Sequence, residues 1–323
     1  MATQTRFLVA CALDQKPTRM NVLKPLTNPA YFFRPRQIVH RFKRALRRQP
    51  LGQFETVTLP WGVPLRVRPD EVIGSNIWCY GIFDLVVCEA ICRLLDHSEV
   101  AVDIGANIGL MTSLMRCRAG KDGRVIAFEP HPELFSELRH NISLLQPADS
   151  VAPADLHNLA LSDVAGEALL EVGPAWSSNR GTPKLVAATG SGSGGTVSVK
   201  TGVLDQILDG RTAIGVCKMD VEGHELRALQ GANRLLAARR VRDLIFEDFG
   251  TYPSPVHQFL LDRGFRIFSL HTRLWKPQLA PALQRVRFRP VVDGQNYLAT
   301  LDPARAARRF ATPGWRALGK TKG

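Results

Sequence analysis

Short apolar runs alternate with stretches of helical periodicity between about residue 97 and residue 270. The apolar runs predict buried strands, and the intervening stretches, in which apolar residues recur every three or four positions, predict helices. We expect strands at 100–103, 124–129, 156–161, 214–220, 244–249 and 265–270, and helices at 108–117, 132–145, 224–237 and 256–263. Such alternation is typical of a mostly parallel, doubly wound sheet with helices on both faces. The pattern therefore predicts an α/β fold.

Other segments depart from this alternation. Residues 173–202 are rich in Gly, Ser and Pro, which predicts a flexible insertion that either covers a ligand at the strand ends or is inert. Residues 37–48 carry apolar positions at helical spacing with basic residues between them, which predicts a basic amphipathic helix. The expected organisation is a basic N-terminal extension (1–50), a main domain (51–272), and a basic C-terminal segment (273–323) that completes the sheet near 296–300 and continues as a tail.

Positive charge is concentrated at the two ends of the 323-residue chain, whose formal net charge is +13. Residues 1–50 contain 11 Lys and Arg against one acid, residues 273–323 contain 11 against two, and the middle is acidic. A nucleic-acid enzyme usually carries its basic surface on the domain that performs the chemistry, so a nucleic-acid partner is not expected. The basic ends suit either packing on the main domain with a solvated face, or peripheral contact with an anionic membrane or an acidic carrier.

The sequence also indicates the compartment. No window approaches the roughly 18 consecutive apolar residues of a membrane span. Residues 7–13 imitate the core of a secretory signal, but this run is short and leads into Asp14 without a convincing cleavage site. The six cysteines form no C-x-x-C pair, and five lie in apolar contexts where free thiols pack as small hydrophobic residues. We therefore expect a cytoplasmic protein.

The stretch VDIGANIG, residues 102–109, is the most informative motif. Gly105 permits a sharp turn after the first strand, and Gly109 lets the next helix lie close to it. Glu129 ends the second strand, where a carboxylate can accept hydrogen bonds from ribose hydroxyls. A second carboxylate, Asp103, directly precedes the turn and favours a ligand with a cation over one with a pyrophosphate. S-adenosylmethionine, which carries an ammonium and a sulfonium, fits this combination.

Four motifs in order make the chain resemble the FkbM-type S-adenosylmethionine-dependent methyltransferases. They are DIGANIG (103–109), AFEPHP (127–132), ALSD (160–163) and KMDVEGHE (218–225). The resemblance covers about residues 72–270 and implies a Rossmann-like class I methyltransferase fold with S-adenosylmethionine as the cofactor. One position departs from it, because Asp84 stands where the family usually has Glu.

The resemblance also implies which residues hold the cofactor. Glu129 would hold the ribose, and Ser162 and Asp163 would lie near the adenine, although Asp163 also fits a simple turn before the next strand. The floor of the pocket around the methionine part would be formed by Asp103, Gly105, Ala106, Asn107 and Gly109.

The last motif supplies the candidate catalytic residues, because the strand before it lies beside the first strand in such sheets. We expect Asp220 to position the cofactor or the acceptor, and His224, whose ordinary pKa lies near neutrality, to remove the acceptor proton. Glu222 and Glu225 either orient His224 or begin the next helix as first-turn acids, and Lys218 braces the turn.

These features predict an S-adenosylmethionine-dependent enzyme that O-methylates a hydroxyl of a sugar, glycan or natural product. A NAD-linked or nucleotide-sugar oxidoreductase is one alternative, disfavoured by the missing G-x-G-x-x-G. A non-catalytic RNA or membrane-surface binder is another, but it leaves the cluster at 218–225 unexplained. No resident metal is expected, although Asp220 with Glu247 or Asp248 offers the oxygen ligands that Mg²⁺ prefers.

Overall fold

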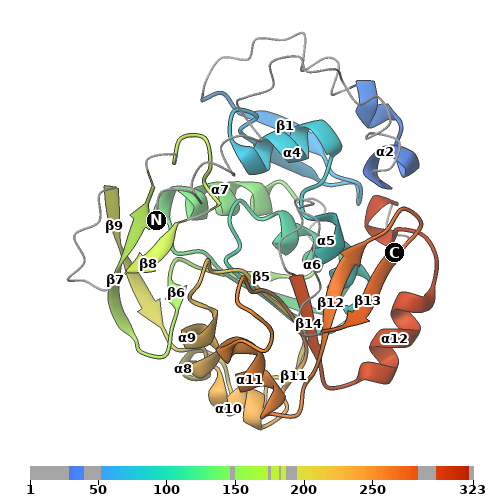
Figure 1. Ribbon diagram of the computed structural model, residues 1–323. Helices are drawn as coiled ribbons and strands as arrows, with labels where there is room; N and C mark the ends of the chain where they lie inside the picture. The colour runs from blue at the N-terminus through green and yellow to red at the C-terminus, as the bar shows by residue number, and fades with distance from the viewer. Residues whose placement is uncertain are drawn as a thin grey trace.

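The computed structural model describes residues 29–39, 52–145, 150–173, 176–181, 183–186, 195–282 and 296–319. An eight-stranded sheet lies at its centre, with helices on both sides (Figure 1). The strand order is β13-β12-β14-β11-β10-β3-β4-β5. The bounds are Val100–Ile104 (β3), Arg124–Phe128 (β4), Ala154–His157 (β5), Ile214–Met219 (β10), Val241–Glu247 (β11), Arg266–Thr272 (β12), Pro277–Pro281 (β13) and Asn296–Thr300 (β14).

The strand directions are those of a doubly wound sheet. The neighbours β5, β4, β3, β10 and β11 run parallel, and β14 is antiparallel to both β11 and β12. The chain adds β4 and β5 on one side of β3 and then returns to place β10 and β11 on the other side. Strand order therefore reverses between β3 and β10, and such a switch point is where open α/β sheets bind their ligands. This topology confirms the predicted fold class.

Alternate residues of each central strand face opposite sides of the sheet, and each side has its own core. In β3, Ala101 belongs to the core shared with α5 and α6, whereas Val102 belongs to the core shared with α10 and α11. Helices on the first side are α5 (Leu85–Leu94), α6 (Leu110–Ala119), α7 (Pro132–Ser143) and α12 (Pro303–Ala311). Helices on the second side are α8 (Leu204–Ile207), α9 (Glu225–Gln230), α10 (Asn233–Ala237) and α11 (Pro255–Leu261).

The expected third strand divides between two sheets. Its first part lies in β5, and its second part, β6 (Ala160–Leu161), begins a smaller sheet with β7 (Gly166–Val172), β8 (Lys184–Val186) and β9 (Gly195–Gly202). The prediction of a flexible insertion is therefore wrong for residues 195–202, which pair with β7. Their sequence alternates Val with polar residues, a strand signal that the neighbouring Gly and Ser obscured. Residues 187–194 lie outside the described residues.

The N-terminal part covers one end of the molecule. It contains α2 (Pro29–Phe33), a hairpin of β1 (Glu55–Thr58) and β2 (Pro64–Val67), and α4 (Val72–Tyr80). Residues 36–39 are helical, and the remainder of the expected basic helix lies outside the described residues. Among the residues that are described, no helix has both the length and the apolar character to cross a membrane.

The end of the chain differs from the expected tail. After β14 it forms α12 and a short 3₁₀ helix, η3 (Arg316–Leu318). Arg93 of α5 holds this segment in place, because its fully buried guanidinium donates to three main-chain oxygens. The acceptors are Arg309 O at 2.5 Å, Thr312 O at 3.0 Å and Gly314 O at 2.7 Å. Glu89 completes the arrangement by accepting from Arg93 Nε at 2.6 Å.

Candidate active site

The carboxyl ends of β3, β10 and β11 lie at one edge of the sheet, at the switch point. Ile104 lies opposite Met219 in the β3–β10 register, and Met219 lies opposite Phe246 in the β10–β11 register. The residues that follow these pairs, Gly105, Asp220 and Glu247, therefore leave the three strands at the same edge. Two of the predicted motifs meet here, as the sequence led us to expect.

The turn at Gly105 leaves no room for a side chain. The φ of Gly105 is +76°, and a Cβ added there would lie 1.9 Å from the carbonyl oxygen of Asp220. Two residues on, Asn107 also has a left-handed backbone, with a φ of +50°. Gly109 precedes α6, and a Cβ there would lie 2.8 Å from Cδ1 of Leu138 in α7. Gly105 thus lets the turn approach the end of β10, and Gly109 lets the start of α6 approach α7.

Lys218 links the turn to two carboxylates. Its ammonium donates to Gly105 O at 2.8 Å and lies 3.6 Å from Asp103 Oδ1 and 3.7 Å from Asp220 Oδ2. Burial lowers the pKa of Lys218, but Asp220 and Asp103 outweigh it and raise that pKa above its ordinary value. The ammonium therefore stays charged, which fits the predicted bracing role.

Asp103 is fully buried. Its Oδ2 accepts from Thr112 Oγ1 at 2.6 Å, whereas its Oδ1 has no hydrogen-bond partner among the described residues. Burial raises the pKa of this carboxyl, and the charge of Lys218 partly opposes the increase. The nearest cation to this oxygen is the ammonium of Lys218, 3.6 Å away, so the charge of Asp103 depends on that ion pair.

Glu129 follows β4 and joins the turn to the second strand. Its carboxylate is buried and accepts from the main-chain nitrogens of Asn107 and His131, each at 2.8 Å. Burial raises the pKa of Glu129 to about 7, and the two main-chain hydrogen bonds limit the rise. A carboxylate has about four acceptor positions, so two remain for hydroxyl groups of a ligand.

Ser162, Asp163 and His224 form a hydrogen-bonded group beside this edge. Ser162 Oγ donates to Asp163 Oδ1 at 2.9 Å and lies 3.0 Å from His224 Nε2. Burial lowers the pKa of His224, so its ring is neutral at pH 7. Because the hydroxyl hydrogen of Ser162 goes to Asp163, Nε2 must donate to Ser162, which leaves Nδ1 as the free acceptor of the ring.

The same group explains why the helix expected at 224–237 is divided. Gly231 lies between α9 and α10, and a Cβ there would lie 2.0 Å from the carbonyl oxygen of Ser162. This close approach brings α9, which His224 precedes, against Ser162, the residue that follows strand β6. The sequence signal for it was the glycine inside an otherwise helical pattern.

Several carboxylates lie together at the carboxyl ends of β10 and β11. Glu247 ends β11, and opposite it in β14 lies Asn296, whose amide nitrogen is 3.4 Å from Asp84 Oδ2. The pKa of Glu247 is raised to about 8, first by burial and then by the charges of Asp220 and Asp84. Burial and Asp220 similarly raise the pKa of Glu222 to about 7. Two side chains of this edge therefore titrate near neutral pH.

Sequence reasoning found only part of this acidic edge. The sequence indicates Glu247 only as a possible metal ligand, gives no signal for Asn296, and marks Asp84 only by its departure from the family residue. Asp84 has a left-handed φ of +47° and precedes α5 without capping it. Asp248 instead accepts from Ser254 Oγ and from Gly250 N, at the start of α11. Within the described residues, no three His, Cys, Asp or Glu are grouped so that they could hold a metal ion.

Comparison with known proteins gives consistent matches. A family model described as "Methyltransferase FkbM domain" matches residues 103–267. Hexuronic acid methyltransferase AglP from Haloferax volcanii is 30% identical over 168 residues, which cover 50% of this chain and 62% of that protein. Methyltransferase FkbM from Methylobacillus flagellatus is similar in structure, with a TM-score of 0.38, 18% identity, and coverage of 62% of this chain and 43% of that chain. An S-adenosylmethionine-dependent O-methyltransferase from Thermotoga maritima has a TM-score of 0.39 and 11% identity, with 80% of each chain covered.

Proposed function

Because this chain belongs to the FkbM family of S-adenosylmethionine-dependent methyltransferases, we propose that it methylates a hydroxyl group of a sugar. The observation that carries the proposal is the edge at the switch point, where the Gly105 turn adjoins a row of carboxylates. A sugar is favoured because AglP, 30% identical over 168 residues, is a hexuronic acid methyltransferase. The match spans 62% of AglP, so we extend to this chain only the class of acceptor.

The residues around the turn suit the cofactor. Gly105 lets the turn approach Asp220 O closely, and the buried carboxylate of Asp103 directly precedes that turn, which favours a cationic ligand over an anionic one. Glu129 has acceptor positions left for the ribose hydroxyls. When bound, S-adenosylmethionine supplies the electrophilic methyl group. We assign Asp103, Gly105, Ala106, Asn107, Gly109 and Glu129 to its binding.

A hydroxyl acceptor must lose a proton as it attacks, and His224 is the side chain best suited to take it. Its ring is neutral at pH 7, and its Nδ1 is free to accept. The contact with Ser162 gives that serine a role in orienting His224, in addition to the predicted place near the adenine. Glu247, with a pKa of about 8, is mostly protonated at pH 7, so it is suited to donate a hydrogen bond rather than to take the proton. Asp220 and Glu222 then position the acceptor.

Calorimetry tests the cofactor site first. We expect heat on titration with S-adenosylmethionine and with its demethylated product, S-adenosylhomocysteine. Gly105→Ala should weaken both titrations at least tenfold, because its Cβ would displace the main chain of Asp220. Gly166→Ala is the matched control, since its Cβ would have no neighbour nearer than 3.9 Å. Absence of heat for both ligands with folded wild-type protein contradicts the proposal.

The acceptor is tested with methyl-labelled cofactor and a panel of sugars. The panel pairs uronic acids with the corresponding neutral hexoses, and mass spectrometry locates the added methyl group. Label on an oxygen of a sugar supports the proposal. Label found only on nitrogen, or only on acceptors that are not sugars, overturns it while leaving the family assignment in place.

A further inference from the structure

A surface of aromatic and basic side chains forms where α2 meets the turn between β12 and β13. It consists of Phe32, Phe33 and Trp275 with Arg34, Arg36, Arg273, Lys276 and Arg316, and we call it the aromatic–basic surface. We propose that this surface docks on a membrane that contains anionic phospholipid. The proposal concerns binding of the chain to a bilayer and does not depend on methyl transfer.

The aromatic part is exposed and is assembled by the fold. Phe32, Phe33 and Trp275 are 47%, 38% and 60% exposed. The Phe32 ring packs edge-on against Trp275, with 4.9 Å between ring centroids, and against Phe33 at 5.2 Å. Residues from distant parts of the sequence therefore form one apolar cluster in contact with solvent. Clustered exposed aromatics mark an interaction site, and Trp is enriched where proteins meet the membrane interface.

Basic side chains surround this cluster. The chain near η3 lies against the same turn, because Gly314 N donates to Trp275 O at 2.9 Å and Trp315 Nε1 donates to Leu274 O at 3.1 Å. Lys276 Nζ reaches Ala311 O at 3.4 Å, which keeps its charge beside the cluster. Arg316 follows directly and is exposed. The aromatic cluster is thus bordered by cations from two segments of the chain.

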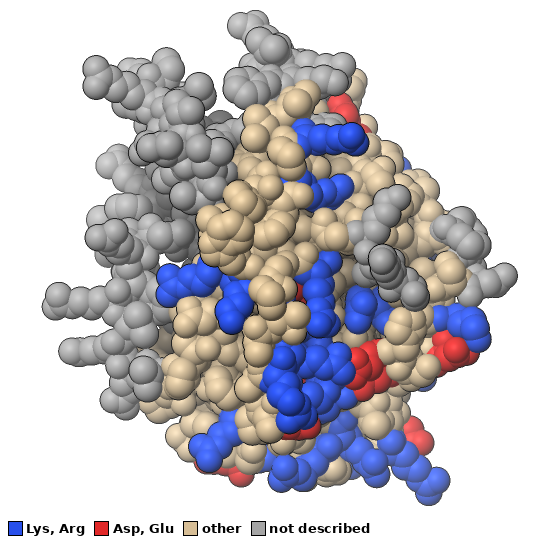
Figure 2. All heavy atoms as spheres, turned by 90° about the vertical axis from the view of Figure 1, so that its right-hand side faces the viewer, with Lys and Arg blue, Asp and Glu red and all other residues tan. Residues whose placement is uncertain are grey.

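These cations lack the acidic partners that neutralise other arginines nearby. Arg36, Arg273, Lys276 and Arg316 are exposed, and none forms an ion pair with another described residue. Arg305 and Arg309 of α12, in contrast, both pair with Asp96. Figure 2 looks onto this side of the molecule and shows many more blue than red side chains around a tan area. The charge therefore favours an anionic partner, and the aromatics favour one with an apolar interior.

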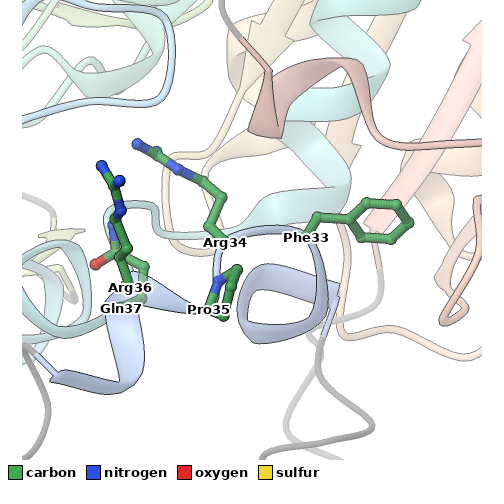
Figure 3. A pocket seen from close by; sticks show the side chains of 5 residues that line it. All are labelled: Phe33, Arg34, Pro35, Arg36 and Gln37. Carbon is green, nitrogen blue, oxygen red and sulfur yellow. The ribbon is translucent and has the colours of Figure 1, made fainter.

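A cavity in the same segment suits a lipid headgroup. It has a volume of about 320 Å³ and is lined by Phe33, Arg34, Pro35, Arg36 and Gln37. Figure 3 shows the Arg34 and Arg36 side chains extending on the same side of the segment, with the Phe33 ring pointing away from them. Arg34 Nη1 is buried and has no hydrogen-bond partner among the described residues. The guanidinium of Arg36, in contrast, is exposed and can bind a phosphate oxygen, because guanidinium groups bind phosphate strongly.

Sedimentation of the full chain with vesicles tests the proposal. We expect binding to phosphatidylcholine vesicles that contain phosphatidylglycerol and little binding to phosphatidylcholine alone. Phe32→Ser with Trp275→Ser should reduce binding about tenfold or more, and Lys276→Gln roughly fivefold, the value expected for one cation near an anionic surface. The matched controls are Val164→Ser, at an apolar residue that is 65% exposed, and Lys200→Gln, at an exposed lysine of β9.

Further measurements distinguish binding to a bilayer from binding to other anionic ligands. Arg36→Gln should weaken vesicle binding, whereas inorganic phosphate should compete only weakly. The proposal is overturned if the aromatic double variant binds vesicles as wild type does, or if wild type binds both vesicle types equally. It is also overturned if the wild type binds soluble polyglutamate but not vesicles, since that result indicates an acidic carrier. Thermal unfolding followed by circular dichroism shows that each variant remains folded, independently of the cofactor site.

Discussion

Replacing Lys218 with Met removes the only cation that touches both Asp103 and Asp220 among the described residues. Asp103 is completely buried, and its Oδ1 lies 3.6 Å from the ammonium, so the variant leaves a buried carboxylate without its partner. Breaking a buried pair in this way costs about 3–5 kcal/mol of unfolding free energy. Asp220, whose side chain is 41% exposed, adds little because water screens it. We expect Lys218→Met to lose a few kcal/mol.

A second substitution separates the charge effect from lost packing. Asp103→Asn in the Lys218→Met background removes the unpaired charge and keeps the shape, so about 1–3 kcal/mol should return. Burial already raises the pKa of Asp103, and loss of Lys218 raises it further. A carboxyl whose pKa is higher in the folded than in the unfolded state lowers the free energy of unfolding once the pH is high enough to ionise it. The loss of unfolding free energy in Lys218→Met should therefore shrink as the pH falls.

Urea unfolding followed by tryptophan fluorescence measures these changes. Lys200→Met is the control, because Lys200 is exposed and should change the unfolding free energy by less than about 0.5 kcal/mol. The reasoning is refuted if Lys218→Met unfolds at the same urea concentration as Lys200→Met. It is also refuted if Asp103→Asn recovers no stability in the double variant.

Other predictions concern catalysis and the C-terminal segment. His224→Ala should lower kcat about 10²–10⁴-fold with little change in calorimetric cofactor affinity, and unchanged turnover contradicts its role as base. Wild-type turnover should fall as the pH rises through about 8, where Glu247 loses its proton, and Glu247→Gln should abolish that fall in a pH–rate profile. Arg93→Met should cost about 3–5 kcal/mol in urea unfolding, because it leaves Glu89 buried and unpaired. Arg124→Gln, at an ion pair whose side chains are 53% and 42% exposed, should cost under about 1 kcal/mol, and equal losses would contradict this reasoning.

The sheet was predictable because its strands are buried on both faces and therefore read as apolar runs. The Gly105 turn was predictable for a related reason, since a close backbone approach leaves no alternative to glycine. The β9 strand was missed because the Gly and Ser content of this region indicates flexibility and obscures the alternation of Val with polar residues within the strand. The helix α12 was missed although Asp302 caps it and Pro303 begins it, both of which are local signals. Its contact with Arg93, more than two hundred residues earlier, is the part that no local pattern reveals.

The acidic edge was only partly predictable for a similar reason. Asp220 and Glu222 belong to one motif, so the sequence alone predicts that they lie close together. Glu247 and Asn296 are brought to the same edge by strand pairing across the sheet. The contact between Ser162 and His224 also depends on tertiary packing, through the close approach at Gly231.

The three main-chain oxygens that accept from Arg93 have a consequence for biosynthesis. A nascent chain that has emerged only as far as β12 contains α5 but none of the acceptors for its guanidinium. Until residues 309–314 leave the ribosome, that arginine must stay hydrated, and the hydrophobic cluster around α5 stays open. Packing around α5 therefore depends on residues 309–314, and a chain that stopped just after β14 would lack these acceptors for Arg93 and should be prone to degradation.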